Sequence, residues 1–500
     1  MNGKIQGIIV CGVLAASLAG VMVFLNATSP DKDSSSAADA ASQALADSGE
    51  NTKVVLIDKG ADQVSGVKVK NQYGGFTLAK PVSGKTTWTI EELGSLNQNS
   101  TLQSGLADVC GVLEARKLVE ENAEDLAKYG LAEPAASAEI TYADGSTLTL
   151  EVGDVMPEER YRYVRLGDSN NVYMVMGSRV KYFTDPANAY ADLNLIIKPS
   201  DQDWPEYGTE TVTRRDWDYD VVFENDPKEI QGMISSQVIS SPIFSYLNIT
   251  SSSDVTHGMW GLKAAECSVI DPTEEDYERL GLNDPVCVVK LKGDEYDYTL
   301  TVGNKAEYDE EEEAAGAEGY YCTLEGQSGQ DAIYTISSGN LPWVSFKIED
   351  VISSIMLSNY IVDIDTLTVE NGGKSHQYKV TSDGNSEDLM AEGGSANVTS
   401  VTSGGKDIDI ANFKTLFQYI MTCPTGELCF DEPQGDWEVR IEQKLIDGSS
   451  DVVEIYKDTA RRYIVKLNGK PSFRIQSTWV DNLLKNVENL DNGKEVVDTY

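Results

Sequence analysis

The sequence predicts an α+β protein: an N-terminal transmembrane helix, then two or three repeated modules of antiparallel β-hairpins and curved sheets, each with packed helices. Three observations predict it: a long uncharged run at the start, blocks of hairpins between helical stripes, and a motif repeated after about 150 residues. Helices and strands come in blocks, which argues against a parallel βαβ sheet. The expected parts are a transmembrane anchor (1–27), a flexible Ser/Ala/Asp-rich linker (28–52), two modules (53–200 and 201–345) and a degenerate C-terminal α+β module (346–500).

The charge and the histidine content of the chain disfavour two classes of function. The chain has 500 residues, enough for roughly two to four domains of ordinary size. It carries 81 acidic against 40 basic residues, a net charge of −41, so nucleic acid is not an expected partner. It has two histidines, His257 and His376, both expected in loops or at strand edges. Chemistry that depends on histidine, as a general base or a zinc ligand, is therefore disfavoured.

The run Ile5–Leu25 contains no charged residue. As a helix it would span roughly 31 Å, about one hydrocarbon core. Lys4 precedes it and two aspartates follow, so the positive-inside rule places the N-terminus in the cytoplasm and the body outside, as in a single-pass cell-membrane protein. A cleaved signal peptide is the alternative interpretation. The next stretch, 26–51, is rich in Ser, Ala and Asp, which predicts a flexible tether. The alternative is a short Ala-rich helix at 37–47.

The first module begins with two or three strands over 64–90, ending on Trp88. A helical stripe follows at 99–119, and then a short helix in "NAEDLAKYGL" with Gly130 just past its end. Hairpins are expected at 137–154, around an Asp-Gly turn, and at 161–183.

The motif G-L-x-[DE]-P occurs in "YGLAEP" and again in "LGLNDP". Gly281 follows Gly130 by 151 positions, and Gly303 follows Gly153 by 150. The second copy has the same order: a short helix in 273–285, a hairpin at 286–304 and a Tyr-rich pair at 319–337. The prolines suit positions just after a helix end, so the motif indicates a duplicated structural joint. A third, weaker copy is expected from a helix at 407–423 and hairpins at 436–458 and 462–487, with surface insertions at 308–319 and 392–407.

Taken together, the leading apolar helix, the "WTI" strand end at Trp88, "YGLAEP", "LEVGD" and "YRYVRLGDSNNVYMV" resemble the DUF4340 family. The resemblance covers about 64–200, with a looser copy at 270–340. It implies a bacterial membrane-anchored protein found beside gliding-motility-type ABC transporter components: an ATPase, a permease and a GldG-like protein. It supplies no catalytic residues.

Motifs of known chemistry are absent: there is no Walker A, HExxH, GxSxG or GxGxxG pattern. Two S-x-x-K matches, Ser65–Lys68 and Ser178–Lys181, fall in expected strand or edge regions, where the two side chains would face opposite ways. We therefore expect no catalytic, cofactor-binding or metal-binding residues, and no cofactor.

Acidic clusters are the best remaining candidates for a site. "DWDYD" would place Asp216, Asp218 and Asp220 on one strand face; the other clusters are Asp363 with Asp365, Asp407 with Asp409, and the run 309–313. A flat strand face gives too few ligands for Ca²⁺, so solvated surface is the expected role.

Cysteines and tryptophans remain. Cys423 with Cys429, or Cys287 with Cys322, could form disulfides, but buried free thiols are the default expectation. Seven tryptophans are expected mainly as core anchors, with sugar- or peptide-binding surfaces as the alternative: Trp88, Trp204, Trp217, Trp260, Trp343, Trp437 and Trp479.

These observations lead to one functional hypothesis and two alternatives. The chain is expected to be a non-enzymatic accessory, binding or scaffold component of an ABC-type transport or cell-envelope complex, anchored outside the membrane. The first alternative is a carbohydrate-binding protein or hydrolase that uses carboxylates in a groove between modules. The second is a Ca²⁺-stabilised adhesive module.

Overall fold

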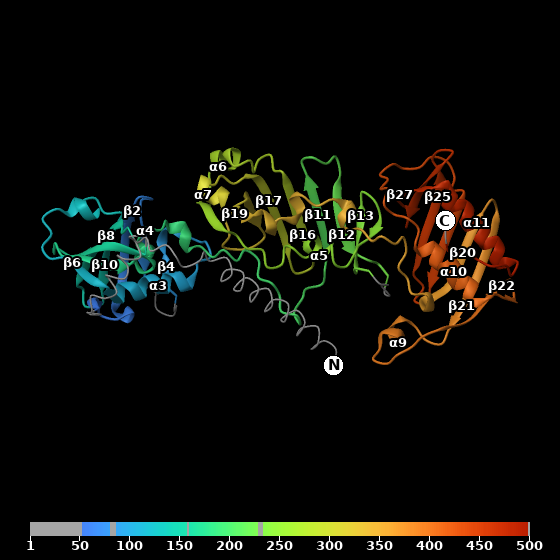
Figure 1. Ribbon diagram of the computed structural model, residues 1–500, viewed down its shortest axis with the longest axis horizontal. Coiled ribbons are helices and arrows are strands. Elements are labelled where there is room, and N and C mark those ends of the chain that lie inside the picture. The colour runs from blue at the N-terminus through green and yellow to red at the C-terminus, as the bar shows by residue number, and fades with distance from the viewer. Residues whose placement is uncertain (1–52, 81–86, 158–159, 229–233, 499–500) are drawn as a thin grey trace, which may run out of the picture.

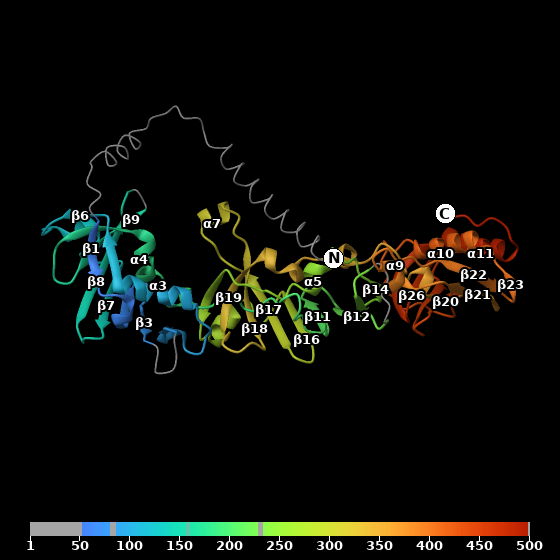
Figure 2. The same ribbon diagram turned by 90° about the horizontal axis from the view of Figure 1, so that it is seen from below.

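The computed structural model describes residues 53–80, 87–157, 160–228 and 234–498. Three large antiparallel sheets lie in a row, with the first and third at opposite ends (Figure 1). The same row appears when the molecule is seen from below (Figure 2). We call each sheet with its helices a unit: the first unit (53–195), the second unit (196–352) and the third unit (353–498).

The first sheet has the order β4-β3-β2-β7-β8-β9-β10-β6. Its strands are β2 (Val64–Asn71), β3 (Phe76–Ala79), β4 (Thr89–Ile90), β6 (Lys117–Glu120), β7 (Ala136–Tyr142), β8 (Thr147–Val155), β9 (Tyr161–Leu166) and β10 (Val172–Met176). A separate pair joins β1 (Val54–Asp58) to β5 (Val112–Ala115). The helices are α3 (Ser100–Gly111), α4 (Gly177–Thr184) and the 3₁₀ turns η1 (Ala61–Gln63), η2 (Glu91–Leu93), η3 (Leu126–Tyr129) and η4 (Ala187–Tyr190).

The second sheet has the order β14-β13-β12-β11-β16-β17-β18-β19-β15. Its strands are β11 (Thr209–Arg214), β12 (Asp220–Asn225), β13 (Gln237–Ser241), β14 (Ser245–Tyr246), β15 (Glu266–Ile270), β16 (Cys287–Lys292), β17 (Asp297–Lys305), β18 (Gly319–Glu325) and β19 (Ala332–Ser337). The helices are α5 (Ser253–Thr256), α6 (Glu274–Arg279), α7 (Glu310–Ala314), α8 (Ile348–Val351), η5 (Ser338–Asn340) and η6 (Pro342–Val344).

The third sheet has the order β23-β22-β21-β20-β24-β25-β26-β27. Its strands are β20 (Ile364–Asn371), β21 (Lys374–Ser382), β22 (Val398–Ser403), β23 (Lys406–Asp407), β24 (Val439–Leu445), β25 (Ser450–Lys457), β26 (Arg462–Leu467) and β27 (Lys470–Gln476). The helices are α9 (Ser386–Met390), α10 (Ile410–Met421), α11 (Ser477–Asp491) and η7 (Ile361–Asp363).

The three sheets share one topology. In each, an early strand pairs at the centre of the sheet with a strand that comes much later in the chain: β2 with β7, β11 with β16, and β20 with β24. A four-stranded meander continues from that later strand. In the first two sheets an extra edge strand, β6 or β15, pairs with the last meander strand. In the third, a single bridge between Leu428 and Phe473 occupies that position, so the third sheet is a reduced version of the same plan.

The repeated motif is a joint between a helical turn and a hairpin. In the first copy, η3 ends at Gly130, whose φ of 65° is left-handed and suits glycine. A Cβ on Gly153 of β8 would lie 2.2 Å from the carbonyl oxygen of Tyr129, and one on Gly130 would lie 2.3 Å from Asp154. Leu131 is buried beside this contact. The helix end therefore rests directly on the hairpin backbone.

The second copy repeats the contact. Gly281 has a φ of 75°, and a Cβ on Gly303 of β17 would lie 2.4 Å from the carbonyl oxygen of Leu280. The backbone N–H of Asn304 donates to that same oxygen at 2.8 Å, and Leu282 is buried. Because the two sequence segments touch in both copies, they recur together at the same spacing. The interpretation of the motif as a structural joint is confirmed.

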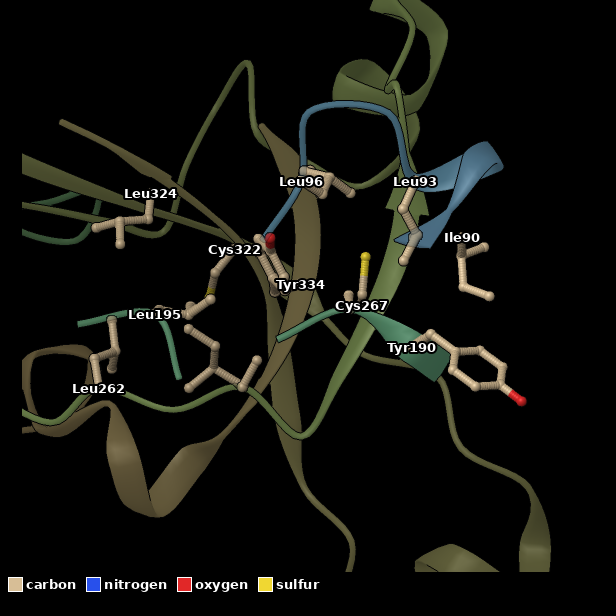
Figure 3. Close-up of a cluster of buried hydrophobic side chains, with 14 of the residues drawn as sticks. Ile90, Leu93, Leu96, Tyr190, Leu195, Leu262, Cys267, Cys322, Leu324 and Tyr334 are labelled. Carbon is tan, nitrogen blue, oxygen red and sulfur yellow. The ribbon is translucent and has the colours of Figure 1, made fainter. Parts of the chain in front are cut away.

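The buried core is continuous across both junctions. Residues of the first and second units form one cluster. Figure 3 shows Ile90, Leu93 and Leu96 of the first unit together with Cys267 and Tyr334 of the second in this cluster. A second cluster combines four side chains of the second unit with the core of the third: Ile234, Val238, Phe244 and Tyr246.

The N-terminal part of the predicted fold class needs correction, and so does the localisation drawn from it. The predicted transmembrane helix and linker lie outside the described residues. A helix needs about 20 apolar residues to span a bilayer. The longest helix among the described residues, α11, has only 15 residues. Within the described ranges no helix is long and apolar enough to cross a bilayer. The predicted single-pass anchor, and the cell-membrane placement that followed from it, are therefore not supported.

Three local predictions were also wrong. Ser178 and Lys181 lie on α4 and not on a strand, because Val180 and Phe183, three residues apart, are buried as a helical stripe. The segment 392–407 contains β22 and β23 and is not merely a surface insertion, because Val398 and Val401 of β22 are both buried, with a register irregularity between them.

The third error concerns "DWDYD". Strand β11 ends at Arg214, so Asp216 and Asp218 lie in the turn and only Asp220 begins β12. Arg214 covers the ring of Trp217 at 4.2 Å and binds Asp216 at 2.6 Å, which favours a tight turn here. The three carboxylates therefore do not share a strand face.

Candidate functional site

The structure disperses most of the residues that sequence alone had singled out. The Nζ of Lys181 is largely exposed and lies 3.5 Å from a carboxylate oxygen of Asp185. His376 on β21 contacts Asp491 at the end of α11 at 2.5 Å, a contact that fastens the helix to the sheet. Among the described side chains, no three His, Cys, Asp or Glu residues gather in a way that could hold a metal ion.

The two suggested disulfides are not formed. The six cysteines within the described ranges are all buried free thiols, as the default expectation held. Cys287 and Cys322 both lie opposite Val302 of β17, one on each neighbouring strand. Burial raises the pKa of the Cys287 thiol to about 12. These thiols are core residues and poor nucleophiles.

Acids do converge at one hollow beside the first junction. A pocket of about 410 Å³ is lined by Asp271, Glu325 and Asp331, together with Tyr277. All three carboxylates belong to exposed residues. A glycosidase needs one carboxyl held protonated in apolar surroundings. Exposed carboxylates do not meet that requirement, so this pocket does not support the hydrolase alternative.

A second pocket lies against the second unit. It has a volume of about 530 Å³ and is formed by three segments: the stretch that enters the unit, the turn around α5, and the turn of η5 and η6. Its lining residues are Lys198, Trp204, Ser253, Asp254, His257, Gly258, Trp260, Gly261, Leu262, Gly339, Asn340 and Pro342. The volume is within the range of small-molecule sites, about 300–1,000 Å³.

Aromatic rings make one wall of this pocket. Trp204 meets Trp260 edge to face at 6.2 Å and an interplanar angle of 80°, and meets His257 at 5.8 Å and 73°. Trp260 is itself braced by Tyr296 at 5.0 Å and 85°. Trp204 stays 38% exposed although its ring is held on two sides. Near-perpendicular rings form a corner and leave aromatic surface uncovered.

Local sequence sets the shape of the α5 turn. A Cβ on Gly258 would lie 2.2 Å from the carbonyl oxygen of Asp254 and 3.1 Å from Trp343, so only glycine fits there. The Oγ1 of Thr256 donates to the carbonyl oxygen of Ser252 at 3.1 Å and lies 2.8 Å from Nδ1 of His257. Burial lowers the pKa of His257, so its ring is neutral at pH 7.

A buried carboxyl lies close to the residues that support the pocket. Glu210 of β11 accepts a hydrogen bond from Nε1 of Trp343 at 2.9 Å, and that indole also reaches the carbonyl oxygen of Val255 in α5 at 3.0 Å. The second carboxyl oxygen of Glu210 and the hydroxyl of Tyr207 are buried without a hydrogen-bond partner. Burial raises the pKa of Glu210 to about 8, so the group is mostly protonated at pH 7.

Sequence reasoning found part of this site. It named Trp204 and Trp260 as possible binding aromatics, but favoured the core for the tryptophans as a group. Trp343 and Trp479 are core residues, as expected, whereas Trp204 is not. Glu210 was missed, although its alternation with Val212 in β11 would have placed it on the buried face.

Comparison with known proteins gives the family. The family model of DUF4340, a domain of unknown function, matches residues 61–205 and 251–418, more than half of the chain. The chain belongs to the DUF4340 family. The first match contains the whole run from β2 to β10, and the second runs from α5 into α10, so it takes strands from two sheets. A search of curated proteins found no match to this DUF4340 chain.

Proposed function

We propose that this DUF4340 protein is a rigid, non-enzymatic scaffold, an accessory component of an ABC-type transport or cell-envelope complex. The observation that carries the scaffold proposal is the continuity of the buried core across both junctions. The transport partners rest on the resemblance to DUF4340 proteins, which are met beside an ATPase, a permease and a GldG-like protein.

The junction between the first and second units combines apolar burial with backbone hydrogen bonds. The backbone N–H of Asn97 donates to the carbonyl oxygen of Gly329 at 2.7 Å, and its side-chain amide donates to that of Ser328 at 3.0 Å. Asn188 donates to the carbonyl oxygen of Cys267 at 2.6 Å. Hinge motion would break these bonds and expose apolar surface, which supports a fixed angle between the units.

A buried ion pair lies at the junction between the second and third units. Lys228 of the second unit places its Nζ 3.0 Å from Oδ2 of Asp451 in β25, and the two side chains are 3% and 1% exposed. The same ammonium donates to Tyr246 at 2.9 Å and to Asn359 at 3.0 Å. Removing one partner of such a pair would leave the other charge buried and uncompensated, which costs about 3–5 kcal/mol. This network favours one relative orientation of the two units.

Two further contacts support the same junction. The backbone N–H of Phe244 donates to the carbonyl oxygen of Pro471, and the hydroxyl of Ser472 donates to that of Phe244 at 2.7 Å. Tyr219 of the second unit stacks on Phe430 of the third at 5.1 Å. Three units held in this way would act as a spacer that keeps partners bound at its two ends a fixed distance apart.

Affinity purification tests the proposed partners. The tagged full chain, produced in its own host and extracted in mild detergent, should bring down an ABC ATPase and a permease. A tagged permease should recover this chain in return. The transport assignment would be overturned if the tagged chain brought down no transporter subunit and the tagged permease did not recover this chain. Rigidity is a separate claim, which distance measurements between the units test.

A further inference from the structure

We propose that the aromatic pocket of the second unit, between α5 and the stretch around Trp204, binds a neutral saccharide. The proposal goes beyond the scaffold role and does not depend on it. It rests on the shape of the aromatic wall, the mixture of polar groups beside it, and the charge of the pocket.

The aromatic wall suits a flat ligand that has an apolar face. Trp204 is the most exposed member, and it is held by Trp260 and His257 rather than left free to rotate. A pyranose ring has a face of C–H bonds that can pack on an indole. A preorganised ring loses little conformational entropy when it binds, which favours affinity. Trp204 therefore provides the stacking platform.

The other polar lining residues suit hydroxyl groups. They include Asp254 with its carboxylate, Ser253 with its hydroxyl, Asn340 with its amide and Lys198 with its ammonium. The Asn340 amide is oriented by a 3.4 Å contact to the carbonyl oxygen of Lys263. A sugar hydroxyl both donates and accepts, so it can bond to groups of either kind. A purely apolar ligand would leave these polar groups unsatisfied.

Charge selects a neutral saccharide over an acidic one. The lining has one carboxylate, one ammonium and a neutral imidazole, so the pocket itself is close to electrically neutral. The chain around it has a net charge of −41 and repels anions at long range. An acidic glycan would meet that repulsion without a basic cluster to offset it.

Calorimetry and tryptophan fluorescence on the full chain test the proposal with three neutral probes: cellotetraose, maltotetraose and tetra-N-acetylchitotetraose. At least one should bind, and Trp204→Ala should weaken its binding at least tenfold. Asp254→Asn, a smaller change that keeps one acceptor, should weaken it less. Trp437→Ala, at a half-buried tryptophan of the third unit, is the matched control and should bind as the unaltered chain does.

Three results would overturn the proposal. The first is that none of the probes binds at millimolar concentration. The second is that Trp204→Ala, shown to be folded by circular dichroism, binds the saccharide as tightly as the unaltered chain does. The third is that Trp437→Ala loses as much affinity as Trp204→Ala. Octaproline or tetramethylammonium binding at Trp204, without saccharide binding, would assign the pocket to a proline-rich peptide or an organic cation instead.

Discussion

The buried carboxyl of Glu210 should make stability depend on pH in a way that one substitution removes. Its pKa in the folded chain is about 8, raised from 4.5 by burial. Between these values the unfolded chain loses the proton and the folded chain keeps it. Glu210 therefore contributes its full stability below about pH 4.5, and that contribution is lost progressively as pH rises towards 8.

The size of the effect follows from the two pKa values. Each pKa unit is worth about 1.4 kcal/mol, so the loss is about 3 kcal/mol at pH 7 and about 5 kcal/mol above pH 8. Glu210→Gln keeps the shape of the protonated carboxyl and does not titrate. Its unfolding free energy should match that of the unaltered chain near pH 4.5 and exceed it by those amounts at pH 7 and pH 8.5.

Urea unfolding at these three pH values, followed by tryptophan fluorescence and circular dichroism, measures the difference. Comparing the variant with the unaltered chain at each pH cancels the titration of all other groups. The control is Glu224→Gln on the neighbouring strand β12, where the side chain is exposed and the difference should stay near zero. A constant difference for Glu210→Gln across the pH range would refute the assignment of a protonated buried carboxyl.

Three further predictions concern the junctions and the core. Lys228→Met should destabilise the chain by about 3–5 kcal/mol in urea unfolding, because the buried carboxylates of Asp226 and Asp451 lose their counter-charge. Lys485→Met, at an exposed position, should change little, and equal effects would contradict the network. Gly153→Ala should lower the free energy of unfolding, measured in thermal melts, by about 1–3 kcal/mol, because the added methyl group overpacks the joint. Gly426→Ala, which has open space around its Cβ, should leave that free energy unchanged. In a Cys11→Ser background, the six described thiols should react with a thiol reagent only after denaturation, and reaction of the native chain would show that they are not buried.

Local sequence signals predicted much of each unit. The Asp-Gly turn and the alternating residues predicted the hairpin of β7 and β8, and the repeated spacing of the glycines predicted the duplicated joint. The helix over Ser178–Lys181 was missed because its two buried residues follow a strand directly, and a short stripe there resembles a continued strand.

Pairings between distant segments could not be read from the sequence. The central contact of β11 with β16 joins strands that are more than seventy residues apart, and a strand pattern does not name its partner. The pocket has the same origin, because Lys198, Asp254 and Asn340 meet only once the second unit is folded. Glu210 was missed because a carboxylate is ordinarily read as exposed.

The claim that the three units form one rigid body is tested most directly by spin-label distance measurements. Labels would be placed at exposed turns or helix positions of the three units, Asp168, Asp294 and Lys485, each changed to Cys. Rigid junctions should give a single narrow distance distribution between the first two labels, and another between the last two. Broad or multiple distributions for either pair would show that the junctions flex and would contradict the scaffold proposal.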